Sequence, residues 1–138
     1  MAGYSGTPLT TKLGIRSGQV VCVLDEPAGF RSLLDPLPGG VVFKVQVRGA
    51  LDVVVLFVIA RKALERRLPA VSRAIFPNGA LWVAWPNRAS GVATDITEDV
   101  IREVVLPTGL VDDKVCAIDE TWSGLRVVHR RERRVRPT

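Results

Sequence analysis

Short apolar runs alternate along this chain with segments whose apolar residues recur every three or four positions. The apolar runs are rich in valine, leucine and isoleucine, and the run over 51–60 is apolar at almost every position. Such runs are typical of strands that are covered on both faces of a sheet. The strands predicted on this basis are 18–24, 41–47, 51–60, 79–85, 114–119 and 124–130.

The longest periodic segment, 61–76, predicts an amphipathic helix. Its apolar stripe lies opposite a set of arginines, as in a helix that packs on one side only. Pro69 lacks the N–H that the helix needs at that position, so we expect a kink or a break there. Three shorter helices are predicted at 7–14, 27–34 and 97–106. The apolar stripe of the long helix over 61–76 consists of Leu64, Leu68, Val71 and Ile75.

The order of these elements predicts an α/β fold. Apolar strands that alternate with amphipathic helices favour a Rossmann-like three-layer sandwich with a mostly parallel sheet. The last two strands are joined by the short segment "ETWSG", whose length suits an antiparallel hairpin. We therefore expect one domain over 1–129 that ends in this hairpin, followed by a basic, mobile tail over 130–138.

The basic residues are concentrated at the C-terminal end. Of the formal net charge of +5, +4 falls within 130–138, so the rest of the chain is nearly neutral. Arginines on a mobile tail bind nucleic acid weakly and without sequence preference, because they act mainly through counterion release. Weak nucleic-acid binding is therefore expected only through 130–138.

The apolar runs and the two cysteines indicate where the protein is located and whether its thiols are reduced. The longest uninterrupted apolar run, Val53–Ala60, is too short to cross a bilayer, and the first residues lack the pattern of a signal peptide. A cytoplasmic chain that does not enter the membrane is expected. Cys22 and Cys116 both lie in predicted strands, which favours buried, reduced thiols. A disulfide between neighbouring strands is the alternative.

Ligands of open parallel sheets bind beyond the carboxyl ends of the strands, where the strand order reverses. We call the residues predicted at that edge the rim. They combine acids, cations and an indole, which suits a small polar or anionic ligand or a protein partner. The candidate binding residues of the rim are Asp25, Glu26, Arg61, Lys62, Trp85, Asn87, Arg88, Ser90, Thr94 and Asp95.

The connection that follows the strand at 79–85 is unusually long. Links from strand to helix usually take about two to six residues, and an excess is often functional. Helix capping explains the end of this connection in either of two ways. Asp95 caps the next helix together with Glu98. Alternatively, Thr97 is the cap, and the acids that follow it lie at the positive end of the helix dipole.

No catalytic residue and no metal site is expected. His129, the only histidine, is predicted to be a surface residue at the end of a strand, with no carboxylate to orient it as a base. One histidine and two cysteines do not supply a metal-ligand cluster. The order of serine, histidine and aspartate found in hydrolases and the glycine-rich phosphate loop are both absent from the sequence.

Three stretches resemble the core of class I methyltransferases. "LGIRSGQVVCVL" resembles the entry into their first strand, and 51–85 resembles their fourth strand, next helix and fifth strand; the C-terminal hairpin also matches. The resemblance implies a Rossmann-like fold. It also implies a site for S-adenosylmethionine after the first strand, but two determinants of that site differ. The family's glycine-rich loop is replaced by "LDEPAGF", and its ribose-binding carboxylate after the second strand is replaced by "VQVRGA".

From these differences we expect no cofactor. Gly29 is the only glycine of the first loop, and Pro27 and Phe30 should crowd an adenosyl group. The sequence also resembles a group of small, uncharacterised actinobacterial proteins, through "AGYSGTPL", "VAWP" and "SGVATDITEDVIRE". That group supplies no mechanism.

The absence of catalytic motifs on this scaffold favours a non-enzymatic module that binds a small ligand or has a regulatory role. Two alternatives stay open at this point. One is an enzyme that acts on a small polar or anionic substrate at the rim. The other is weak nucleic-acid binding through the arginine tail.

Overall fold

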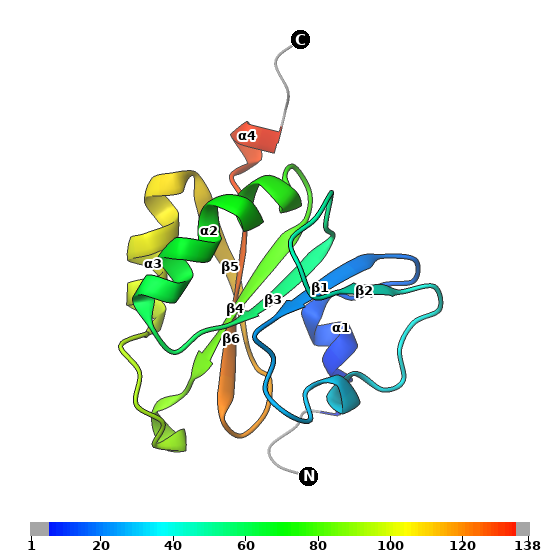
Figure 1. Ribbon diagram of the computed structural model, residues 1–138, viewed down its shortest axis with the longest axis horizontal. Coiled ribbons are helices and arrows are strands. Elements are labelled where there is room, and N and C mark those ends of the chain that lie inside the picture. Colours follow the sequence, from blue (N-terminus) through cyan, green and yellow to red (C-terminus); the bar gives the residue numbers. More distant parts are fainter. Residues whose placement is uncertain (1–5, 135–138) are drawn as a thin grey trace.

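A computed structural model describes residues 6–134 of the chain and contains one mixed sheet (Figure 1). Its strand order is β2-β1-β3-β4-β6-β5. The first four strands along the chain pair in parallel, whereas β6 is antiparallel to both β4 and β5. The predicted Rossmann-like α/β fold with a C-terminal antiparallel hairpin is confirmed. The strands are β1 (Val20–Leu24), β2 (Val42–Lys44), β3 (Val53–Phe57), β4 (Ala80–Pro86), β5 (Leu110–Ala117) and β6 (Trp122–His129).

Helices cover both faces of the sheet, but unequally (Figure 1). The longer pair, α2 (Arg61–Ile75) and α3 (Glu98–Val105), packs on one face. Only the five-residue helix α1 (Leu9–Leu13) and the 3-10 turn η1 (Arg31–Leu34) pack on the other. The remaining short elements are η2 (Arg88–Ser90), η3 (Leu106–Thr108) and α4 (Arg131–Arg134).

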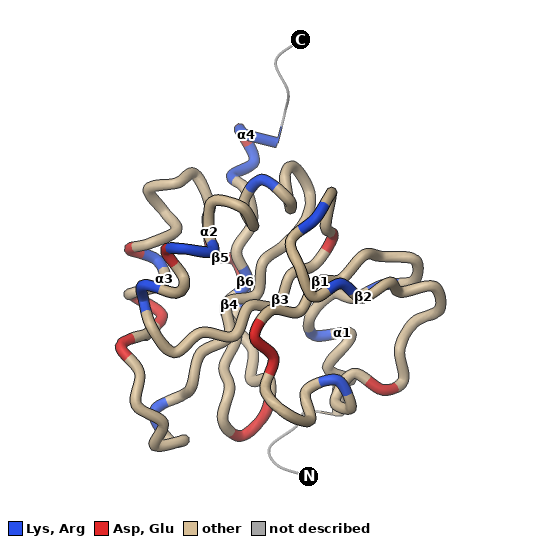
Figure 2. The backbone as a smooth tube through the Cα atoms, in the orientation of Figure 1, with Lys and Arg blue, Asp and Glu red and all other residues tan. Residues whose placement is uncertain are grey.

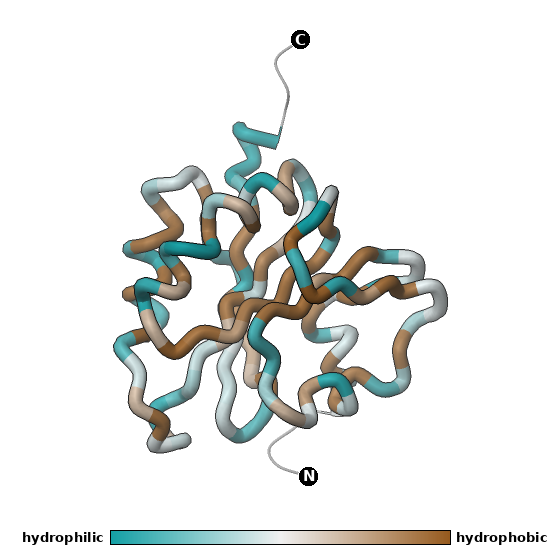
Figure 3. The backbone as a smooth tube through the Cα atoms, viewed as in Figure 1, coloured by the Kyte–Doolittle hydropathy of each residue, from teal (hydrophilic) through white to brown (hydrophobic). Residues whose placement is uncertain are grey.

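Strand β3 shows why the central runs are apolar at every position. Val54 and Leu56 belong to the cluster under α2 and α3, while Val53, Val55 and Phe57 belong to the cluster under α1 and η1. All five side chains of the strand are buried. The most hydrophobic segments in Figure 3 accordingly follow the central strands. A strand between two helical layers has no wet face on which polar residues would be favoured.

Two of the predicted helices differ from expectation. The helix predicted at 27–34 is reduced to the 3-10 turn η1, because Gly29 has φ +85 and so interrupts any helix that begins at Pro27. In contrast, α2 runs through Pro69 without a break. Leu68 before the proline and Val71 after it both pack in the core, and this packing on either side holds the helix together.

Strand β5 begins earlier than predicted and is irregular. It starts at Leu110, and its pairing with β6 shifts register between Asp112 and Lys114. Its middle is polar and exposed, so hydrophobicity alone does not mark this part as a strand.

The basic segment begins with the short helix α4, which is almost wholly basic in Figure 2. The guanidinium groups of Arg133 and Arg134 donate hydrogen bonds to the carbonyls of Thr108 and His129. Residues 135–138 of the predicted tail lie outside the described residues, as do residues 1–5. The division of the chain at 129 stays a prediction.

Both cysteines are free thiols. Cys22 is buried and Cys116 is half-buried, and burial raises the pKa of each thiol above its ordinary value. The reactive thiolate is therefore scarce at neutral pH. Among residues 6–134, no helix is both long enough and apolar enough to cross a membrane.

Candidate functional site

The strand order reverses between β1 and β3. Strand β1 pairs with β2 on one side and with β3 on the other, and all three run in the same direction. The carboxyl ends of β1 and β3 therefore form the switch point at which open sheets bind their ligands. We use "switch point" for the residues that follow these two strands, namely Asp25 and Glu26 after β1 and Ile59 after β3.

The chain makes a strained turn as it leaves β1. Asp25 has φ 56 and is the only non-glycine residue with positive φ among residues 6–134. A backbone conformation of this kind costs about 1–3 kcal/mol and is often associated with functional sites. The Asp25 side chain is 61% exposed, and its carboxylate lies 3.5 Å from the Arg67 guanidinium. The turn thus presents an accessible carboxylate at the switch point.

Phe30 does not obstruct this loop. Its ring is buried and packs edge-on against Phe57, with the ring centroids 4.9 Å apart. Phe57 in turn packs edge-on against Trp122. The prediction that Phe30 would crowd an adenosyl group is wrong, because the ring lies in the core. At Gly29 an added Cβ would have no atom within 4 Å, so the loop backbone is open at that point.

The long connection after β4 is bound to the start of α2. The Thr94 hydroxyl donates a hydrogen bond to the Ile59 carbonyl at 2.7 Å, and the Asp95 carboxylate accepts one from the Arg61 backbone N–H at 2.7 Å. Thr97 caps α3 by accepting from the Val100 N–H. Of the two predicted caps of α3, the Thr97 alternative is therefore correct. Asp95 caps the other helix, α2.

Replacing Asp95 with alanine is expected to lower the free energy of unfolding by about 1 kcal/mol, the usual cost of losing a helix cap. Urea denaturation followed by circular dichroism measures this loss. Asp35→Ala is the matched control, because Asp35 is exposed, lies beyond η1, and its side chain caps no helix. An equal loss in both variants would show that the Asp95 contact contributes nothing specific.

Two of the other predicted rim residues form ion pairs, and a third is exposed. The Arg61 guanidinium lies between α2 and α3, where it pairs with Glu103 at 2.8 Å and Glu65 at 3.2 Å. Hydrogen bonds from those two carboxylates raise the Arg61 pKa. Glu26 pairs with Arg31 at 3.1 Å, and Lys62 is exposed on α2.

A hollow of about 480 Å³ at the end of β4 brings four of the predicted residues together. They are Trp85, Asn87, Arg88 and Thr94. The indole of Trp85 is 93% buried in the core, so it forms a wall of the hollow. Ser90 does not line this hollow; its N–H donates to the Asn87 side chain.

His129 is buried, which corrects the prediction that it lies on the surface. Its ring is only 2% exposed and packs edge-on against Phe76, while Nε2 lies 2.8 Å from the Ser72 carbonyl. His129 is buried because α2 covers the end of β6. Within the described part of the chain, no three His, Cys, Asp or Glu side chains gather as metal ligands.

No family model and no curated protein matches this sequence. Solved structures do match its fold. A SAM-dependent methyltransferase from Aquifex aeolicus is 12% identical with a TM-score of 0.61, and the match covers 86% of each chain. The fold is methyltransferase-like.

Two further solved structures match the same fold. Magnesium protoporphyrin IX methyltransferase from Synechocystis PCC 6803, with bound SAM, is 10% identical with a TM-score of 0.56; the match covers 88% of this chain and 74% of that one. The fibrillarin pre-rRNA processing protein of Methanococcus jannaschii is 12% identical with a TM-score of 0.54, covering 92% of this chain and 70% of that one.

These neighbours contradict the predicted non-enzymatic module. Several solved structures with this methyltransferase-like fold are methyltransferases, and some contain SAM or its product SAH. The predicted non-enzymatic module rests on the absence of catalytic motifs from the sequence. However, a fold can place different residues at the same site, so motifs alone do not decide this question.

The switch point differs from the cofactor site that the sequence resemblance implies. No acid follows β2, where the Lys44 ammonium instead donates to the Arg48 carbonyl. An acid does follow the neighbouring strand, since Asp25 comes directly after β1. Its exposed carboxylate has the chemistry that ribose hydroxyls require, since carboxylate oxygens accept hydrogen bonds from hydroxyl groups.

Proposed function

We propose that this chain is an enzyme that transfers a methyl group from SAM bound at the switch point. The observation that carries the proposal is the strained turn after β1, which exposes the Asp25 carboxylate at the carboxyl ends of the paired strands β1 and β3. The methyltransferase-like fold of the solved neighbours supports the choice of reaction. When bound, SAM would supply an electrophilic methyl group.

Three side chains at the strand ends would hold the cofactor. Asp25 would accept hydrogen bonds from the ribose hydroxyls, since carboxylates accept strongly from such donors. Val45 after β2 and Ile59 after β3 are 66% and 52% exposed, which is unusual for large apolar side chains in this chain. They offer apolar surface to the adenine ring.

The hollow at the end of β4 would hold the methyl acceptor. Its volume of about 480 Å³ falls within the range of small-molecule sites. Arg88 in its lining favours a polar or anionic acceptor. The hydrogen bond from Thr94 to the Ile59 carbonyl joins the wall of this hollow to the switch point. We therefore propose a small polar or anionic substrate rather than a macromolecule.

Asp25→Asn is expected to weaken SAH binding about tenfold, which corresponds to about 1.4 kcal/mol. Asparagine tolerates positive φ well, so the turn should persist while the negative charge is lost. Isothermal titration calorimetry with SAH measures the change. Asp35→Asn is the matched control, because Asp35 is also exposed but lies beyond η1.

Failure of the unaltered protein to bind SAH would overturn the proposal. A tenfold loss in both variants would show a general effect of charge and remove the role given to Asp25. Selective loss in Asp25→Asn would support the role of this carboxylate in cofactor binding. Methyl transfer from labelled SAM to a pool of small metabolites, absent in Asp25→Asn, would support the enzymatic assignment itself.

Three expectations from the sequence stay predictions. They are the cytoplasmic location, the weak binding of nucleic acid through 130–138, and the similarity to actinobacterial proteins of unknown function. The last of these predicts that the Thr94 and Asp95 contacts recur in those proteins, because both residues lie in the shared stretch "SGVATDITEDVIRE".

A further inference from the structure

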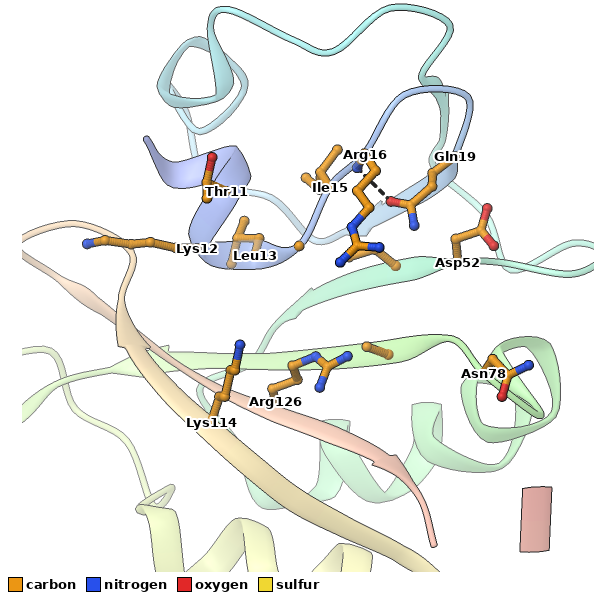
Figure 4. Close-up of a pocket in the computed structure, with 13 residues that line it drawn as sticks. Thr11, Lys12, Leu13, Ile15, Arg16, Gln19, Asp52, Asn78, Lys114 and Arg126 are labelled. Atoms are coloured by element: carbon orange, nitrogen blue, oxygen red, sulfur yellow. Dashed lines mark hydrogen bonds between the residues drawn. The ribbon is translucent and has the colours of Figure 1, made fainter. Parts of the chain in front are cut away.

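A second hollow lies at the opposite end of the parallel strands from the switch point (Figure 4). Its volume is about 430 Å³. One wall is formed by α1 and the turn that follows it, and the other by the hairpin of β5 and β6; the starts of β3 and β4 close its inner end. We call it the basic hollow. The side chains that carry the argument are Lys12, Arg16, Asp52, Asn78, Lys114 and Arg126.

Positive charge dominates this lining. Among the described residues of the lining, four side chains are cationic and one, Asp52, is a carboxylate, which accepts a hydrogen bond from the Val20 backbone N–H at 2.8 Å. Arg126 pairs with Asp113, but within residues 6–134 neither Arg16 nor Lys114 forms an ion pair with a carboxylate. Cations that line a concave surface concentrate positive potential within it. This is notable because the domain outside 130–138 is nearly neutral.

The cations are held on two fixed walls that face each other. Lys114 and Arg126 are direct partners in the pairing of β5 with β6. Opposite them, the end of α1 is attached to the sheet by the buried Trp82, whose indole N–H donates to the Leu13 carbonyl at 2.9 Å. The Arg16 N–H donates to the Gln19 side chain at 2.8 Å (Figure 4). Figure 4 shows Arg16 and Lys114 extending from the two walls into the same space.

We propose that the basic hollow binds a small molecule that carries phosphate groups. Lysine and arginine side chains converging from two walls match the several oxygens of a phosphate group. The volume suits a small ligand. A nucleic-acid strand is disfavoured, since the hollow has no aromatic residue in its lining on which a base could stack. The site is separate from the switch point and does not depend on the proposed methyl transfer.

Calorimetric titration with inorganic pyrophosphate at low ionic strength tests the proposal. We expect saturable binding by the unaltered protein, weakened roughly tenfold by Lys114→Gln and by Arg16→Gln, because each removes one charge-assisted contact. Arg66→Gln is the matched control: Arg66 is exposed on α2, and the substitution changes the net charge by the same amount. This control should bind pyrophosphate as tightly as the unaltered protein.

Absence of saturable pyrophosphate binding would overturn the proposal. An equal loss in Arg66→Gln would also overturn it, since the effect would then be one of net charge. Duplex DNA that binds more tightly than pyrophosphate and loses affinity in Lys114→Gln would assign the hollow to nucleic acid instead. Unchanged SAH binding in Lys114→Gln would confirm that the two sites are independent, whereas its loss would contradict that separation.

Discussion

Replacing Trp82 with alanine is expected to lower the free energy of unfolding by about 3–5 kcal/mol, the usual cost of removing a large buried aromatic side chain. Trp82 is 1% exposed in the middle of β4. Its loss leaves a cavity in the cluster under α1 and also leaves the Leu13 carbonyl without its donor. Urea denaturation followed by far-ultraviolet circular dichroism measures the change without relying on tryptophan fluorescence.

Trp82→Phe separates the two contributions. Phenylalanine fills most of the space but cannot donate a hydrogen bond, so we expect a loss of about 1–2 kcal/mol from the unsatisfied carbonyl and the smaller ring. This variant also remains measurable if Trp82→Ala does not fold. A loss below about 1 kcal/mol in Trp82→Ala would contradict the view that this indole fixes α1 to the sheet.

Gly79→Ala is expected to lower the free energy of unfolding by about 3 kcal/mol, near the upper end for a side chain forced into a packed site. A Cβ at this position would lie 2.5 Å from the Leu51 carbonyl oxygen and 2.9 Å from that of Ile75. Both are backbone atoms, so neither can rotate away as a flexible side chain would. Chemical denaturation measures the loss.

Gly39→Ala is the matched control for this substitution. A Cβ at Gly39 would have no atom within 4 Å, and its φ lies outside the left-handed region. We therefore expect no loss, or a small gain, because alanine reduces the conformational entropy of the unfolded chain. Equal destabilisation by the two variants would show that crowding at Gly79 is not the cause.

The sheet could be predicted from the sequence because its signal is local. Val53–Phe57 is apolar throughout, and only a strand covered on both faces has this pattern at such a short length. The helix predicted at 27–34 does not form, and the reason is also local. The positive φ of Gly29 interrupts the helix, and the sequence does not show which glycines adopt that conformation.

The candidate site was less predictable because it depends on the directions of side chains. The carboxyl ends of β1 and β4 were predicted to within one residue, whereas β2 and β3 each end three residues earlier than predicted. Arg61, moreover, turns toward Glu103, which lies 42 residues away in the sequence. The prediction that Asp95 caps α3 was likewise wrong, because its carboxylate accepts a hydrogen bond from the Arg61 N–H at the start of α2. Such pairings depend on tertiary packing, to which local propensities are blind.

The basic hollow left almost no trace in the sequence. Its cations occur singly at positions from Lys12 to Arg126, each within an ordinary amphipathic pattern. The conspicuous group of charges in the sequence is at 130–138, so binding of nucleic acid through positive charge was predicted only at the C-terminal end. The hollow could have been predicted in part from Lys114 and Arg126. Both lie in the predicted hairpin, where they are opposite each other in the pairing of its two strands.

The irregular pairing of β5 affects how copies of this protein meet one another. An outer strand exposes unpaired N–H and C=O groups, to which a strand from another molecule can add. At β5 such a strand would meet the charges of Asp113 and Lys114. It would also meet a backbone whose pairing register shifts between Asp112 and Lys114. At the opposite edge, β2 offers only three residues. Both borders of the sheet therefore resist edge-to-edge aggregation, although the interior of the sheet is among the most apolar parts of the chain.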